Sequence, residues 1–123
     1  MGNTVVGGYI YSGAAIPELS GKYVFGEWST GFTKPDGALL VSSPPAGYEI
    51  SRYPASVGNI TAMDNAMWTT QELSVVNTTG GRIHAFVRGF GEDGSHELYV
   101  LTSTKSGPDP ATTTGEIWKL VRR

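Results

Sequence analysis

The chain has 123 residues, a formal net charge of -2 at pH 7 and no cysteine, which suits one domain spanning 1–123. The absence of cysteine excludes a disulfide framework, a thiolate metal site and a cysteine nucleophile, and the near-neutral charge excludes a broad basic surface for nucleic acid. No apolar run reaches the roughly 18 residues of a membrane span, and the start lacks a signal peptide's basic segment. We therefore expect a soluble chain that binds neither nucleic acid nor membrane, in a compartment that the sequence leaves open.

The composition favours strands over helices. The chain contains 17 Gly and 7 Pro together with 3 Trp, 6 Tyr and 4 Phe. Glycine and proline are poor helix residues, whereas aromatic and β-branched residues favour extended backbone. Thr, Val, Ile and the aromatic residues dominate the segments between the glycines and prolines. The composition predicts an all-β domain.

The first half of the chain predicts four short strands, at 4–11, 22–28, 38–41 and 48–53. Alternation in the first strand places Val5, Tyr9 and Tyr11 on one face. In the second strand, alternation places Tyr23 and Phe25 on one face. One helical turn at most is expected over 18–21.

The second half begins with a long loop over 55–66 and predicts strands at 67–76, 82–88, 96–103 and 116–121. A glycine-rich turn over 89–95 separates the second and third of these strands. Strands at intervals of roughly 10 to 15 residues are typical of a sandwich, a barrel or propeller blades. The two halves are weakly similar, because in each a strand with an aromatic residue and a turn precede a second, apolar strand.

The segment 89–94 reads GFGEDG and matches the G-x-G-x-x-G pattern of dinucleotide-binding loops. That chemistry needs a helix directly after the loop, and two acidic residues inside the loop would repel a phosphate. The residues that follow predict a strand, so we interpret the segment as a hairpin turn.

The remaining polar residues suggest no metal or catalytic site. His84 and His96 are the only histidines, and no acidic residue stands near them with the spacing of a metal site. The cluster of Glu92, Asp93 and Glu97 could offer oxygen ligands to calcium, but its spacing is not that of an EF-hand loop, and an ordinary turn is the better interpretation. No G-x-S-x-G elbow is present, so a serine triad has no support.

Three arginines could bind an anionic ligand if the fold gathered them: Arg52, Arg82 and Arg88. Arg82 and Arg88 would share one face of the strand predicted over 82–88, about 20 Å apart, which is too far for one small carboxylate. Solubility is the default role of such surface arginines. The three tryptophans leave open a sugar-like ligand, although aromatic residues more often build a core.

The order of these segments resembles the C-terminal part of the glucose/sorbosone dehydrogenase family, the soluble quinoprotein β-propellers. The first similar block reads GGYIYSG at 7–13, IPELSG at 16–21 and YVFGE at 23–27, with Glu27 in place of the family's aspartate. The second block reads FGED at 90–93, ELYVL at 97–101 and GEIWKL at 115–120. The resemblance is carried by residues 1–44 and 82–121.

This resemblance implies a six-bladed propeller of four-stranded blades that binds calcium and pyrroloquinoline quinone (PQQ) and oxidises a sugar. The chain has room for about two such blades, so the fold class expected is an incomplete propeller of antiparallel sheets. The family's catalytic base and calcium ligands come from preceding blades, so we assign no catalytic or metal residue and no cofactor to the isolated chain. Candidate quinone contacts are Arg82, Arg88 and Lys34, the last displaced from the family's lysine position.

Three functions remain open from the sequence. The first is a non-catalytic propeller end that acts by assembly or ligand binding, as in relatives that are binding ectodomains without known catalysis. The second is a truncated portion of an active quinoprotein dehydrogenase, and the third is a small carbohydrate-binding β domain. Because blades cut from a ring leave apolar flanks, we expect self-association through blade faces or edge strands, with an interface above roughly 1,000 Å².

Overall fold

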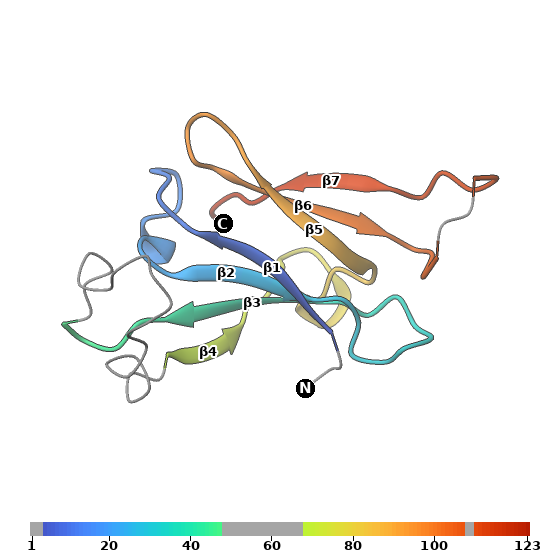
Figure 1. Ribbon diagram of the computed structural model, residues 1–123, viewed down its shortest axis with the longest axis horizontal. Helices are drawn as coiled ribbons and strands as arrows, with labels where there is room; N and C mark the ends of the chain where they lie inside the picture. Colours follow the sequence, from blue (N-terminus) through green and yellow to red (C-terminus); the bar gives the residue numbers. More distant parts are fainter. Residues whose placement is uncertain (1–3, 48–67, 108–109) are drawn as a thin grey trace, which may run out of the picture.

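The computed structural model describes residues 4–47, 68–107 and 110–123, and these ranges form two antiparallel sheets (Figure 1). Sheet A has the order β1–β2–β3–β4, and sheet B has the order β5–β6–β7. The strands of sheet A are β1 (Val5–Ile10), β2 (Tyr23–Glu27), β3 (Ala38–Ser43) and β4 (Thr69–Glu72). Those of sheet B are β5 (Phe86–Glu92), β6 (Leu98–Ser103) and β7 (Glu116–Lys119).

Within each sheet, every strand pairs with the strand that follows it along the chain, so each sheet is a simple meander. Short 3-10 helices, η1 (Pro17–Leu19) and η4 (Thr79–Gly81), lie in the connections. The all-β class is confirmed, and two meandering sheets packed side by side are the arrangement of neighbouring propeller blades. In the described ranges, no helix has the length and apolar character needed to cross a membrane.

The main core lies between the two sheets. Sheet A contributes Val24, Leu39 and Val41 to it, and sheet B contributes Val87, Leu98 and Val100, all buried. Gly26 of β2 allows the sheets to approach closely, because a Cβ atom there would lie 2.8 Å from Val87 Cγ1 and 3.1 Å from the Phe90 ring.

β2 and β3 are near-continuous apolar runs because both of their faces carry apolar side chains. Alternation along β2 places Val24 on the inner face, toward sheet B, and Tyr23 and Phe25 on the outer face. The rings of Tyr23 and Phe25 stack with centroids 5.1 Å apart, which confirms the predicted common face. Both rings are only half-buried. Over β2 and β3, sheet A is therefore largely apolar on both sides, as expected for strands that have a neighbour on each face. β4, at the edge of the sheet, is polar and exposed.

The strand predicted over 82–88 is wrong in its position. β5 begins at Phe86 and runs to Glu92, so Gly89 and Gly91 lie within the strand and not in a turn. His84 has a φ of 50°, which breaks the extended backbone that the alternation of residues 82–88 predicted. The hairpin turn instead occupies the few residues between β5 and β6.

Other predicted boundaries shift by a few residues. The strand expected over 67–76 is reduced to β4, and Val5, Tyr9 and Tyr11 do not share a face, because the pairing of β1 with β2 shifts register between Val6 and Tyr9. Val5 is exposed and Tyr11 is buried beyond the end of the strand. The strand predicted over 48–53 and the loop over 55–66 lie outside the described residues.

Candidate functional site

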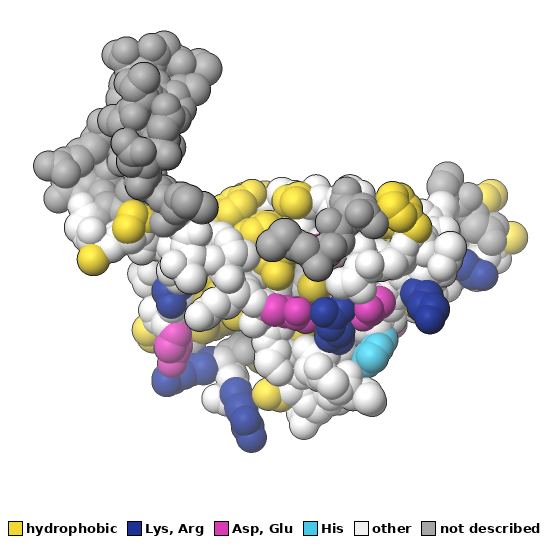
Figure 2. Space-filling view, turned by 90° about the horizontal axis from the view of Figure 1, so that it is seen from below, with side chains coloured by type: hydrophobic (Ala, Val, Ile, Leu, Met, Phe, Trp, Pro, Cys, Tyr) yellow, Lys and Arg dark blue, Asp and Glu magenta, His cyan; other side chains and the backbone are white. Residues whose placement is uncertain are grey.

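Arg82 joins the connection before β5 to two parts of sheet A. Its guanidinium lies 3.0 Å from the Asp36 carboxylate and 3.1 Å from that of Glu72, and it also donates to the Thr30 hydroxyl at 3.4 Å. Hydrogen bonds from Thr30 and Arg82 lower the pKa of Asp36, and the bond to Asp36 raises the pKa of Arg82. Figure 2 shows acidic and basic side chains side by side on this face of the molecule. Arg82 is therefore engaged in a surface ion-pair network.

The other two candidate quinone contacts lie in different elements. Arg88 is exposed in β5 and donates through its guanidinium to the Lys105 carbonyl oxygen at 2.5 Å. Lys34 is exposed in the turn between β2 and β3, where its backbone N–H donates to the Gly31 carbonyl. The strand face predicted to hold both Arg82 and Arg88 is wrong, because Arg82 precedes β5. The three residues form no assembled cradle for the quinone, whose contacts stay a prediction from the resemblance.

Both histidines are exposed and bonded within the chain. His84 Nε2 lies 2.7 Å from the Thr79 carbonyl oxygen, and His96 Nδ1 lies 2.9 Å from the Glu92 carboxylate. The predicted hydrogen-bonded role of His84 is confirmed, but it lies before the strand and not on it. In the part of the chain that the structure describes, no three His, Asp or Glu side chains gather as metal ligands would.

The segment that matches the dinucleotide-binding pattern is confirmed as part of a hairpin. β5 pairs with β6 up to Glu92 and Leu98, so a strand follows the turn, where nucleotide binding would require a helix. The Asp93 carboxylate accepts hydrogen bonds from the backbone N–H groups of Ser95, at 2.9 Å, and Glu97, at 3.0 Å. The bond from Glu97 is the main cause that lowers the pKa of Asp93. Asp93 therefore stabilises the turn.

Glu97 is a buried carboxylate that links the two halves of the chain. Its side chain accepts hydrogen bonds from the Tyr11 hydroxyl at 2.7 Å and from the backbone N–H groups of Ala14 and Ala15 at 3.0 and 2.9 Å. The Tyr11 oxygen in turn accepts the N–H of Ile16 at 2.8 Å. The Tyr11 bond, followed by those from the loop, lowers the pKa of Glu97, whereas burial and the Glu97 bond raise that of Tyr11.

The sequence interpretation missed the roles of Glu97, Tyr11 and Glu27. Glu97 and Tyr11 are 86 residues apart, and nothing local in the sequence indicates that they meet. Glu27, in the position of the family's aspartate, is only 6% exposed, and within the described residues its Oε1 has no hydrogen-bond partner. An acidic residue inside an otherwise apolar strand was the available signal, because buried carboxylates are uncommon without a partner.

The outer faces of the two sheets form a second candidate site, for protein contact. On sheet A, cross-strand register places Leu40 beside Phe25, and Glu27 beside Val5, on the side away from sheet B. On sheet B, register places Leu101 beside Ile117, and these are 37% and 70% exposed. Both faces therefore present apolar side chains to the surroundings.

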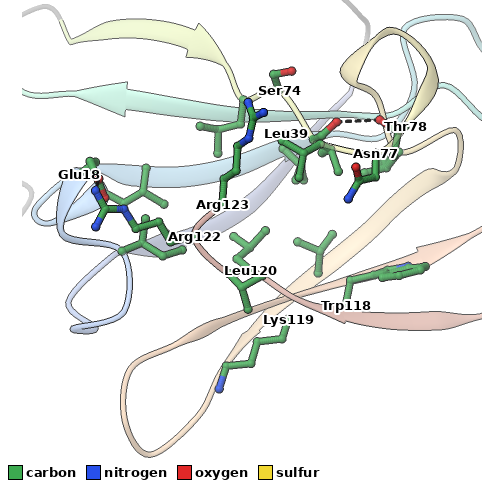
Figure 3. A pocket seen from close by; sticks show the side chains of 18 of the residues that line it. Glu18, Leu39, Ser74, Asn77, Thr78, Trp118, Lys119, Leu120, Arg122 and Arg123 are labelled. Atoms are coloured by element: carbon green, nitrogen blue, oxygen red, sulfur yellow. Dashed lines mark hydrogen bonds and ion pairs between the residues drawn. The ribbon is translucent and has the colours of Figure 1, made fainter.

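A third feature is an apolar cavity of about 680 Å³ between the sheets, on the side of β7. Its walls come from sheet A, from the connection that follows β4 and from sheet B, as Figure 3 illustrates with Leu39, Leu120 and Trp118. The Trp118 side chain lies at this cavity and is 56% exposed.

The three tryptophans lie in different elements. Trp28 stacks on Phe86 with ring centroids 4.7 Å apart, Trp68 precedes β4, and Trp118 belongs to β7. Trp28 is therefore a packing residue, and Trp118 is the exposed tryptophan among the described residues. Binding of a sugar-like ligand stays a prediction.

Comparison with known proteins finds relatives that align with almost the whole of this chain. The chain is 27% identical over 117 residues to Hedgehog-interacting protein of Mus musculus and to that of Homo sapiens. The aligned region covers 95% of this chain but only 13% of each relative. No family model matches the chain, so the predicted quinoprotein relationship has no support from the comparisons.

Proposed function

We propose that this chain is a non-catalytic pair of neighbouring propeller blades that works by assembly, with its outer faces packed against further blades. The observation that carries the proposal is the apolar character of both outer faces. A domain that functions alone would be expected to place polar side chains on at least one side of each sheet. Similarity to Hedgehog-interacting protein, which has a β-propeller, supports the same architecture.

The outer face of sheet A offers a shaped contact surface. Tyr23, Phe25 and Leu40 are half-buried on it, and Val5 at its edge is 71% exposed. The unpartnered carboxyl oxygen of Glu27 lies on the same side of β2 by alternation. Because Glu27 is only 6% exposed, this oxygen is not itself part of the contact surface.

The outer face of sheet B has matching properties. Gly89 and Gly91 lie on it opposite Leu101 and Tyr99, and a Cβ atom at either glycine would meet nothing within 4 Å. A neighbouring sheet can therefore approach closely, as sheet B approaches sheet A at Gly26. Lys119, on the same face, is paired with the Asp93 carboxylate at 3.5 Å.

These two faces are different and complementary, so one copy would contact the next in a head-to-tail manner. Head-to-tail contacts close into a ring when the rotation between copies permits it. Propellers have about four to eight blades, so a dimer or trimer of a two-blade chain would complete a ring. An interface above roughly 1,000 Å² would be expected for each contact.

The relatives support interaction more than catalysis. Their name, Hedgehog-interacting protein, describes a protein that interacts with Hedgehog and names no reaction. Because this chain spans about an eighth of their length, we do not extend that partner to it; we propose only that the blade pair serves protein contact.

The test is the solution mass of the chain, measured by light scattering behind a sizing column over a range of concentrations. We expect one closed oligomer, and we expect Phe25→Glu on the outer face of sheet A to shift the mass to that of one chain. Val76→Glu is the matched control, because Val76 is also an exposed apolar residue but lies after β4 at the cavity. It should leave the mass unchanged.

Three results would overturn the proposal. A strict monomer at high concentration would contradict assembly and would favour an independent β domain, whose sugar binding would then be measured. Oxidation of a sugar by the chain with PQQ, calcium and an electron acceptor would contradict the non-catalytic role. If only addition of the preceding blades restored that activity, the chain would be a truncated portion of a quinoprotein dehydrogenase.

A further inference from the structure

The two sheets differ in strand number, and the difference leaves β7 at an edge. Over the ranges that the structure describes, sheet A has four strands and sheet B has three. Within the described residues, β7 pairs with β6 on one side and with nothing on the other. All four residues of β7 are exposed, Ile117 and Trp118 by 70% and 56%. Exposed apolar edge strands invite pairing with another chain.

The backbone of β7 offers a definite set of hydrogen-bonding groups at this edge. Leu120 N–H donates to the Leu98 carbonyl at 2.9 Å. Because antiparallel pairing alternates, the register of β7 on β6 directs the N–H and C=O groups of Ile117 and Lys119 away from β6. These groups match the ladder of an added strand, which a lipid or a sugar cannot reproduce.

The apolar cavity lies directly beside this edge. Trp118 of β7 and Leu120, which follows β7, line it on one side, and Leu39 of β3 lines it on the other (Figure 3). Leu73, which follows β4, also belongs to its lining. A strand placed beside β7 would direct alternate side chains toward sheet A. Those side chains would enter the cavity, and the side chains between them would extend the outer face of sheet B.

We propose that β7 and this cavity form an acceptor site for an extended segment of a partner polypeptide, which completes sheet B as its fourth strand. The segment carries apolar side chains at alternate positions, because the cavity is apolar. Its main chain pairs with Ile117 and Lys119. This mode is strand addition, in which main-chain bonds give affinity and side-chain pockets give specificity.

The charges at the cavity indicate one more property of the partner. Among the described residues of its lining, Arg122, Arg123 and Lys119 are basic and Glu18 is acidic. The Lys119 ammonium is paired with Asp93 at 3.5 Å, so Arg122 and Arg123 are the basic groups considered at the cavity. Arg122 is paired with Glu18 at 2.5 Å. An acidic residue at the end of the segment beside Arg122 and Arg123 would complement this excess of positive charge.

The experiment uses the whole chain and a synthetic peptide of alternating valine and threonine residues with a glutamate at each end. Binding is measured by calorimetry and by the fluorescence of Trp118 in a Trp28→Phe, Trp68→Phe background. We expect a blue shift of the emission as Trp118 is buried. A peptide N-methylated at alternate residues should bind at least about tenfold more weakly, because it loses ladder hydrogen bonds.

Two variants separate the ladder from the cavity. Lys119→Pro removes an outward N–H without touching the β6 pairing and should weaken binding at least about tenfold. The matched control is Thr70→Pro on β4, the edge strand of sheet A, which should bind the peptide like the parent chain. Trp118→Glu should also weaken binding, and its high exposure permits the chain to fold.

Three results would overturn the acceptor site: no peptide binding to the parent chain, equal binding of the N-methylated peptide, or unchanged binding by both Lys119→Pro and Trp118→Glu. Circular dichroism of each variant establishes that it is folded. The site does not depend on assembly through the outer faces. A monomeric chain that binds the peptide would therefore reject the proposed function and retain this inference.

Discussion

The first strands of the two sheets, β1 and β5, both contain a bulge, but their bulge glycines have opposite surroundings. In β1 the register passes from Val6 opposite Gly26 to Tyr9 opposite Val24, and β5 also gains one residue, at Arg88. A Cβ atom on Gly8 would lie 1.8 Å from the Val24 carbonyl oxygen, whereas one on Gly89 would meet nothing within 4 Å.

The difference indicates which parts of the two sheets are already covered within the chain and which are open. The bulge of β1 is packed against β2, and only glycine permits that approach. The bulge of β5 has the same place in its sheet, but its outer side is open and available to another sheet. The weak similarity between the two halves of the sequence thus has a structural counterpart, in two related sheets with different degrees of enclosure.

The largest effect that this comparison predicts is for Gly8→Ala. The added methyl group would overlap backbone and not a flexible side chain, so β1 would have to move away from β2. We expect the free energy of unfolding to fall by about 3 kcal/mol, the upper part of the range for overpacking. The measurement is urea denaturation followed by circular dichroism.

Gly89→Ala is the matched variant in sheet B. Alanine adds no contact there and reduces the backbone freedom of the unfolded chain, so we expect a change between zero and a gain of about 1 kcal/mol. Equal losses for Gly8→Ala and Gly89→Ala would show that the two bulges are equivalent, and the contrast between the sheets would be wrong.

The sequence predicted much of the strand pattern because local rules govern it. β2, β3 and β6 are apolar runs bounded by turn residues, and their existence follows from that pattern. The predicted position of β5 was wrong because glycine favours turns, and Gly89 and Gly91 were therefore assigned to a turn. In the structure both glycines lie in β5, on the open side of sheet B. Nothing in the neighbouring sequence indicates that these two glycines belong to a strand.

The candidate sites were less predictable, because they depend on contacts between distant residues. The bond between Glu97 and Tyr11 joins the loop after β1 to the start of β6. Arg82 was predicted on a strand, as a surface residue or a possible ligand of an anion, and only the fold brings Asp36 and Glu72 to it. The cavity likewise results from the angle between two sheets, which strand patterns do not determine.

The second largest loss of stability is expected at Glu97, which links the two sheets. Glu97→Gln keeps the shape of the side chain but removes the charge that accepts three hydrogen bonds, so we expect Tm at pH 7 to fall by about 5 °C or more. The control is Glu116→Gln on exposed β7, which should change Tm by less than about 2 °C.

The pH dependence of this variant identifies the carboxylate as the cause. The fold lowers the pKa of Glu97 from its usual 4.5, so its stabilisation is present above about pH 4.5 and is lost as the pH falls through the folded-state pKa. The difference in Tm between the parent chain and Glu97→Gln should therefore shrink on acidification. A difference that stays constant from pH 7 to pH 3 would contradict this account.

The smallest effect is expected at Arg82, where the connection before β5 is joined to sheet A at the surface. Arg82→Lys retains the charge but cannot bridge Asp36 and Glu72 with a planar guanidinium. The Arg82 side chain is 29% exposed, and solvent screening weakens such ion pairs. We therefore expect the free energy of unfolding to fall by about 0.5 to 1 kcal/mol, and by less in high salt.

The control is Arg88→Lys, which breaks a single hydrogen bond to a carbonyl oxygen and should lower the free energy of unfolding by less than about 0.5 kcal/mol. A loss at Arg82 that equalled the loss for Gly8→Ala and persisted in high salt would mean that the ion-pair network, and not close packing, determines how sheet A is held to the rest of the chain.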